Sequence, residues 1–94
     1  MRESVIQDQL LAWLRGSPRS GYAVNIHGDP MQERGIPDIL SCWKGRLLGI
    51  EVKVPGGNPD ETQVYHIDSI LAAGGIAFCA HSLHEAQDIL ENWE

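Results

Sequence analysis

The chain has 94 residues, enough for a single domain (1–94) with one modest core, and its apolar share of 43% excludes a disordered tail. No apolar run approaches the roughly 18 residues that cross a bilayer, so we expect no membrane partner. The net charge of −6 disfavours a simple nucleic-acid binder. However, residues 1–53 carry +1 and residues 54–94 carry −7, so one half could face DNA; two acidic surface helices would explain the asymmetry equally well.

Residues 3–15 predict the first helix, because apolar side chains recur there at helical spacing. Ser4 and Gln7 have the spacing of a capping box. Residues 21–27 predict the first strand, since larger apolar side chains alternate along them. A polar segment then leads to Gly35.

Two further strands are predicted at residues 38–42 and 47–53, which are rich in strand formers. Residues 43–46 predict the turn between them, with Gly45 supplying the free backbone. A chain folded at this turn pairs the two strands antiparallel.

The hairpin brings Asp38 close to Glu51. Side chains alternate along a strand, so Glu51 and Lys53 point to the same face. Two acids can hold a hard divalent cation such as Mg²⁺, which polarises a phosphodiester and activates a water. Lys53 could orient or deprotonate that water, or neutralise charge on the phosphate. For an isolated E-x-K, a solvated pair on an exposed strand is the ordinary interpretation.

After the hairpin, Asn58 as N-cap and Pro59 at the first helical position predict a second helix that runs to Ala73. Gln63 lies early in this helix, at the edge of the core. The expected buried stripe of the helix consists of Val64, Ile67, Ile70 and Leu71.

Residues 76–80 are nearly all apolar, which predicts a central strand buried on both faces and parallel to the Glu51 strand. Ser82 and Glu85 predict a capping box for a last helix. We expect Cys42 and Cys79 to be free, buried thiols of a reducing cytosol.

Pro37-Asp38 followed by Glu51-Val52-Lys53 resembles the PD-(D/E)xK nuclease signature. The wider sequence of residues 35–40 and 50–53, with Gln63 in a downstream helix, is most similar to the VRR-NUC family (virus-type replication-repair nucleases). The resemblance covers most of the chain. It implies an α/β fold with a restriction-endonuclease-like core, α-β-β-β-α-β-α, in which helices flank a mixed four-stranded sheet.

The resemblance also implies a Mg²⁺- or Mn²⁺-dependent endodeoxyribonuclease. Asp38 and Glu51 would bind the metal with the main-chain carbonyl of Val52, and Gln63 would assist Lys53 in catalysis. An acid on the first helix often completes the metal site of this family, so Glu3 is a candidate ligand. An acid favoured by the dipole at a helix N-terminus is the alternative for Glu3.

Candidate DNA contacts are Arg34 and Gly35 before the site, and Lys44 and Arg46 at the turn; Arg34 could equally be a solvated loop residue. We expect a homodimer, because cutting both strands of branched DNA needs two sites. Four-way (Holliday) junctions are the expected substrate, in the DNA repair of a bacterial or phage-infected cell. The start of the chain lacks a signal-peptide layout, so we expect a cytoplasmic protein.

Three alternatives remain open from the sequence. A restriction-type or DNA-end nuclease shares this core, and a nuclease acting on RNA is another possibility. A non-catalytic DNA-binding module with a relic site is the third, although the intact set of Asp38, Glu51 and Lys53 argues against it.

Overall fold

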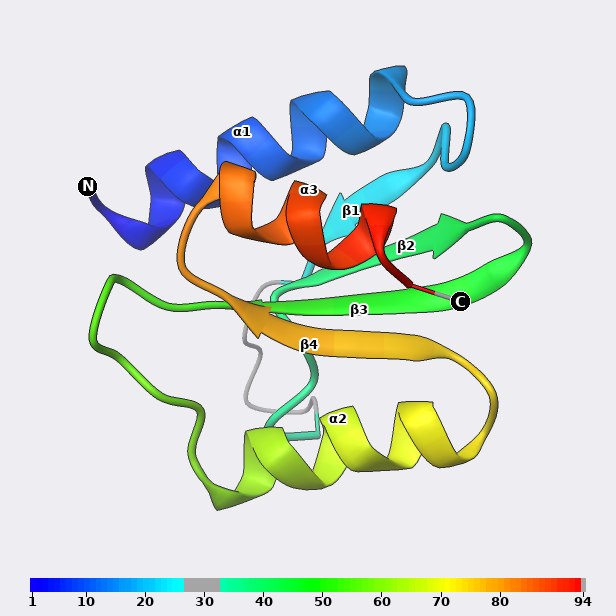
Figure 1. Cartoon of the computed structure of the whole chain (residues 1–94). Helices are drawn as coiled ribbons and strands as arrows, with labels where there is room; N and C mark the ends of the chain where they lie inside the picture. Colours follow the sequence, from blue (N-terminus) through cyan, green and yellow to red (C-terminus); the bar gives the residue numbers. More distant parts are fainter. Residues whose placement is uncertain (27–32, 94) are drawn as a thin grey trace.

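The computed structural model describes residues 1–26 and 33–93. These residues form three helices and four strands in the predicted order (Figure 1): α1 (Glu3–Gly16), β1 (Ala23–Asn25), β2 (Ile39–Trp43), β3 (Arg46–Val52), α2 (Glu61–Ala72), β4 (Ile76–Ala80) and α3 (Leu83–Glu91).

The four strands form one mixed sheet in the order β1-β2-β3-β4. β2 pairs antiparallel with β1 and β3, whereas β4 pairs parallel with β3. Helices α1 and α3 cover one face of the sheet and α2 lies on the other (Figure 1). The predicted α/β architecture, a mixed four-stranded sheet flanked by helices, is therefore confirmed.

The prediction that residues 76–80 form a central strand is wrong, because β4 lies at the edge of the sheet. α2 packs against one face of this strand and α3 against the other. The strand is apolar on both faces because helices cover both, even though only β3 pairs with it.

The hairpin turn is confirmed. Trp43 pairs with Arg46, and the two residues between them both have positive φ, 50° at Lys44 and 81° at Gly45. Positive φ at both central positions is the backbone of a type I′ turn, which suits the right-handed twist of paired strands. The turn length fixes the register of the whole hairpin.

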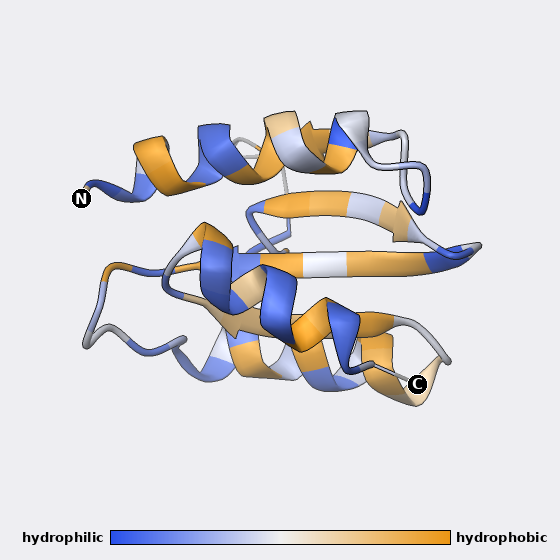
Figure 2. Cartoon of the chain, turned by 45° about the horizontal axis from the view of Figure 1, so that its top comes forward, coloured by the Kyte–Doolittle hydropathy of each residue, from blue (hydrophilic) through white to orange (hydrophobic). Residues whose placement is uncertain are grey.

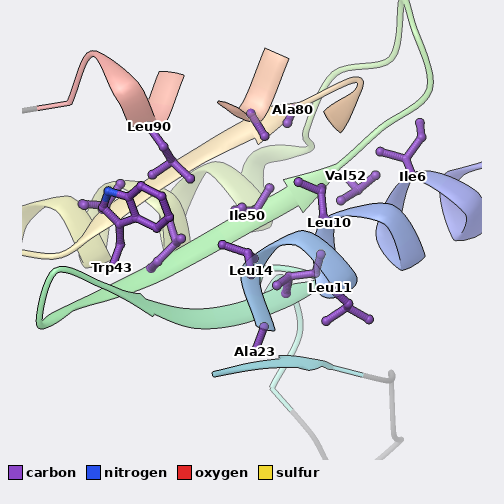
Figure 3. Packing of buried hydrophobic residues seen from close by; sticks show 14 residues of the cluster. Ile6, Leu10, Leu11, Leu14, Ala23, Trp43, Ile50, Val52, Ala80 and Leu90 are labelled. Carbon is purple, nitrogen blue, oxygen red and sulfur yellow. The ribbon is translucent and has the colours of Figure 1, made fainter. Parts of the chain in front are cut away.

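The core lies between the sheet and the pair α1 and α3 (Figure 3). Leu48, Ile50 and Val52 alternate along β3 and are fully buried on this side. Figure 2 shows the strands as mostly hydrophobic and the helices as two-sided, with one hydrophilic face. Trp43 closes one end of the core, where its ring lies 5.5 Å from that of Trp13.

The expected buried stripe of α2 is not buried. Val64 and Leu71 are each 39% exposed, and no residue of α2 is fully buried. Among the described helices, only α2 covers this face of the sheet, so its apolar residues are shielded on one side only. The layer that α2 forms on this face is thinner than the layer that α1 and α3 form on the other face.

α1 begins at Glu3 as predicted, but its predicted capping box is wrong, and so is the predicted start of α2. α1 begins at Glu3 with no side-chain cap, and the amide oxygen of Gln7 accepts from Asn25 of β1 at 2.9 Å instead of closing a capping box with Ser4. α2 begins at Glu61 with Asp60 as its N-cap, two residues after the predicted Asn58.

For α3, the Oγ of Ser82 caps the helix as predicted, accepting from the Glu85 N–H at 3.0 Å. The box is not closed, because the Glu85 carboxylate contacts His81.

Residues near the first strand and the two thiols depart from expectation in smaller ways. β1 is shorter than residues 21–27, and His27 lies outside the described residues. Both cysteines are free as expected, but neither is fully buried: Cys79 is half-buried, and Cys42 is exposed on the sheet face that α1 and α3 do not cover. Among the described helices, none is both long and apolar enough to span a membrane.

We expect Leu48→Ala to lower the free energy of unfolding by about 2–5 kcal/mol, because it removes a fully buried side chain and leaves a cavity. The adjacent Leu47→Ala is the matched control, since Leu47 is 50% exposed on the opposite face, and its cost should stay near 0.5 kcal/mol. Urea unfolding measures both. Equal losses would contradict the assignment of the core to the α1 and α3 side.

Candidate active site

The register of the hairpin places two carboxylates side by side. Ile39 of β2 pairs with Ile50 of β3, so Asp38, one residue earlier, lies opposite Glu51, one residue later. The Oδ2 of Asp38 accepts a hydrogen bond of 2.9 Å from the Val52 N–H. The proximity of Asp38 and Glu51 that the sequence predicts is therefore present at this end of the sheet.

These acids lie on the α2 face of the sheet. A Cβ atom built on Gly49, two residues before Glu51, would meet Pro37 and the Ile70 side chain of α2 at 2.9 and 3.0 Å. Glu51 shares this face by the alternation of the strand. Its side chain is only 2% exposed, although it sits in the thinner of the two layers.

Gln63 is held toward Glu51 by the start of α2. The Oε1 of Gln63 accepts from the Asp60 N–H, and the Gln63 N–H donates to Asp60 Oδ1, both at 2.9 Å. Because this capping box occupies Oε1, the Nε2 group is left to donate to Glu51 Oε2 at 3.3 Å. The sequence analysis missed Asp60, although the Asp60-x-x-Gln63 spacing is a signal that could have identified it.

Lys53 completes the arrangement on the same Glu51 oxygen. Its Nζ atom lies 4.0 Å from Glu51 Oε2, and its side chain is 22% exposed, so the ammonium lies between the buried acid and solvent. The second oxygen of Glu51, Oε1, is buried and has no hydrogen-bond partner among the described residues. An orphaned carboxylate oxygen is costly in a protein interior unless another group binds it.

The pKa of Glu51 is raised from 4.5 to about 8. Burial is the largest cause, and the hydrogen bond and charge of Asp38 add to it, while Lys53 opposes the shift. Glu3 contributes a smaller raising effect through its charge. Without a cation, the Asp38 and Glu51 pair therefore keeps a proton at neutral pH.

The pair fits a divalent cation of the Mg²⁺ type. The described residues contain no group of three or more acids, histidines or cysteines that could hold a metal, so Glu3 does not join the two carboxylates in one ligand cluster. Mg²⁺ is commonly held by one or two carboxylates while it keeps several waters. When the pair is deprotonated, Oε1 has no partner and the two carboxylates repel each other, and a positive ion would relieve both effects.

The structure does not bring Lys44 and Arg46 to the acids. Arg46 starts β3, so it lies about 17 Å along the strand from Glu51. Its guanidinium donates to the carbonyls of Gly74 and Gly75 at 3.0 and 3.2 Å, which ties the hairpin to the end of α2. Contact of these two residues with DNA stays a prediction.

Gly35 lies closer to the site. Gly35 has a φ of +86°, and a Cβ atom there would come within 2.6 Å of the Thr62 carbonyl oxygen of α2. This glycine therefore allows close packing of the chain against α2. Its predicted contact with DNA stays a prediction. Arg34 is exposed.

The fold has a counterpart among solved structures. A protein described as "VRR_NUC domain protein" superposes on 99% of this chain and 88% of its own, with a TM-score of 0.78 and 16% sequence identity. No family model matches the sequence. No curated protein matches it either. At this identity the likeness establishes the shared fold.

We expect Glu51→Gln to stabilise the metal-free protein at pH 8 but not at pH 4.5. The folded protein keeps the Glu51 proton up to about pH 8, whereas the unfolded chain releases it near 4.5. Between these values wild-type stability falls by up to about 1.4 kcal/mol per pH unit from this group, and the neutral amide removes that loss.

Urea unfolding in EDTA at several pH values measures this difference, with the exposed Glu91→Gln variant as control. A gain from Glu51→Gln that is the same at pH 5 and pH 8 would show that Glu51 is ionised throughout in the folded protein.

Proposed function

We propose that the protein is a metal-dependent DNA endonuclease that hydrolyses phosphodiester bonds. The observation that carries this proposal is the buried Glu51 carboxylate, which meets Asp38 on one side and Lys53 and Gln63 on the other. The fold shared with a VRR_NUC domain protein supports the same class of activity.

In this proposal, Asp38 and Glu51 bind Mg²⁺ or Mn²⁺, together with the main-chain carbonyl of Val52. The bound cation supplies Lewis-acid polarisation of the scissile phosphodiester. The Val52 N–H fixes the orientation of Asp38 through its hydrogen bond of 2.9 Å. Glu3 would lie outside this ligand set and act on the Asp38 and Glu51 pair through its charge.

Lys53 is the catalytic cation of the protein itself. From its position at the solvent edge of the pair, its amine can orient or deprotonate the attacking water, or neutralise charge that develops on the phosphate. Gln63 donates to Glu51 Oε2 and so orients the carboxylate that would hold the metal.

The proposed substrate is branched DNA, with four-way junctions foremost, cut in the cytoplasm of a bacterial or phage-infected cell. Arg34, which is exposed and precedes Asp38 by four residues in the chain, is the first candidate for a contact with the DNA backbone. Lys44 and Arg46 would reach only a long substrate, because they lie at the far end of the hairpin.

The central experiment compares wild type with Lys53→Ala on linear, flap and four-way DNA, with Mg²⁺, Mn²⁺ or EDTA. We expect metal-dependent nicking near the branch by wild type and a loss of rate of roughly 100-fold or more in the variant, the usual size for removal of a positioned acid–base group. An RNA arm tests the alternative substrate.

Lys44→Ala is the matched control, since it removes the other lysine of the chain at the far end of the hairpin. It should change the affinity for DNA at most and leave the maximal rate near wild type. Cleavage in EDTA, or equal cleavage by Lys53→Ala and wild type, would contradict the proposed mechanism.

We further propose that the protein acts as a homodimer, because incision of both strands of a junction needs two sites and a 94-residue domain covers little DNA. Light scattering at micromolar concentration should give twice the monomer mass of 10.4 kDa. A monomer under these conditions, with junction cleavage intact, would exclude the dimer.

A further inference from the structure

Residues 54–60 follow the proposed catalytic lysine, Lys53, and lead from the end of β3 to α2, with Gly57 beside the lysine side chain. A Cβ atom built on Gly57 would lie 3.3 Å from Lys53 Cβ and 3.9 Å from Lys53 Cδ. The Gly57 N–H donates to the Val54 carbonyl at 2.9 Å, which closes a turn at this point. The backbone of Gly57 therefore lies beside the aliphatic part of the Lys53 side chain, with little room for a side chain between them.

His81 links the backbone of Gly57 to α3. Its Nε2 lies 2.8 Å from the Gly57 carbonyl oxygen, and its Nδ1 lies 3.0 and 3.1 Å from the two oxygens of Glu85. A carbonyl and a carboxylate only accept hydrogen bonds, so both ring nitrogens act as donors when the imidazole is protonated. His81 thus links the loop to α3.

The position of His81 follows from the sheet. It comes directly after Ala80 of β4, and Ala80 pairs with Val52 and accepts from the Lys53 N–H at 3.1 Å. The end of β4 therefore delivers His81 beside the residue where β3 ends and the loop begins.

We propose that His81 is a positioning residue for Lys53: by holding Gly57 against the lysine stem, it keeps the ammonium beside Glu51. The inference rests on the proposed function, because the position of Lys53 affects a rate only if Lys53 takes part in the reaction. None of the sequence patterns singled out His81.

The electrostatics of His81 agree with this geometry. The pKa of His81 is raised, first by the Gly57 carbonyl and then by Glu85, while burial opposes the shift. Glu85 on α3 is the charged group that faces it among the described residues, and the loop offers only an uncharged carbonyl. The link is complete at low pH and weakens as pH rises through the raised pKa.

The chain offers a matched control on α3. His84 and Asp88 have the same i, i+4 spacing as His81 and Glu85, and His84 Nε2 lies 3.4 Å from Asp88 Oδ2. Their side chains, however, are 84% and 61% exposed. His84→Ala therefore removes a similar histidine–acid pair that has no part in holding the loop.

The first test measures Lys53 itself, without any cleavage assay. The chain has two lysines, so a limited dose of an amine-acylating reagent followed by mass spectrometry gives the ratio of modified Lys53 to modified Lys44. We expect this ratio to rise about five-fold in His81→Ala, because local opening frees the stem, and to stay unchanged in His84→Ala.

The second test measures cleavage of junction DNA at saturating metal. His81→Ala should lower kcat by about 10-fold, since small displacements of a catalytic group are costly, while KM and the metal requirement change little. Glu85→Gln, which leaves the backbone cap of α3 intact, should lower kcat less, and it keeps the test decisive if His81→Ala does not fold.

The outcomes separate the two proposals. Unchanged Lys53 acylation in the folded variants, or increased acylation with an unchanged kcat, overturns the role of His81 and leaves the nuclease proposal intact. Increased acylation in a protein whose wild type does not cleave DNA overturns the nuclease proposal, whereas the hold of His81 on Lys53 stands as a structural property.

Discussion

The pairing register of β2 with β3 is the constraint on which the candidate site depends. Ile39 and Ile50 are both fully buried and paired, and the next residues outward are Asp38 and Glu51. Because side chains alternate, a register slip of one residue would move Asp38 to the opposite face. The type I′ turn at Lys44 and Gly45 excludes that slip, so local turn chemistry determines whether the two acids meet.

The same pairing places an unfavourable cluster in the thinner layer of the fold. Glu51 is 2% exposed beside a second carboxylate, and one of its oxygens has no partner among the described residues. Hydrogen bonds from Gln63 and from the Val52 N–H offset part of this cost for the pair. The apolar core on the α1 and α3 side supplies the stability that the site lacks.

Local patterns identified most of the fold and the central residues of the candidate site. The hairpin followed from strand formers around a glycine turn. Gln63 contacts Glu51, while its part in catalysis stays a prediction. The misassignments arose where distant packing decides the outcome. The edge position of β4 depends on which strands pair, and the exposure of α2 depends on what covers it. A run of apolar letters cannot distinguish these cases.

Competing partners explain the remaining misses. The Gln7 side chain bonds to Asn25, and the Glu85 carboxylate turns to His81, so neither closes the capping box that its spacing suggests. Both partners come from elements distant in sequence or from outside the helix, and helix-spacing rules do not include them. The role of His81 was invisible for the same reason, since its main contact, Gly57, is 24 residues away.

The close approach of Gly35 to Thr62 has a mechanical consequence. A Cβ atom at Gly35 would meet both the side chain and the backbone carbonyl of Thr62 at 2.6 Å, so the segment that enters β2 packs tightly against the start of α2. The segment carries Asp38 three residues later, and α2 carries Gln63 at the next position. Under the proposed function, DNA that displaced the start of α2 would therefore also displace Asp38, a proposed metal ligand, together with Gln63.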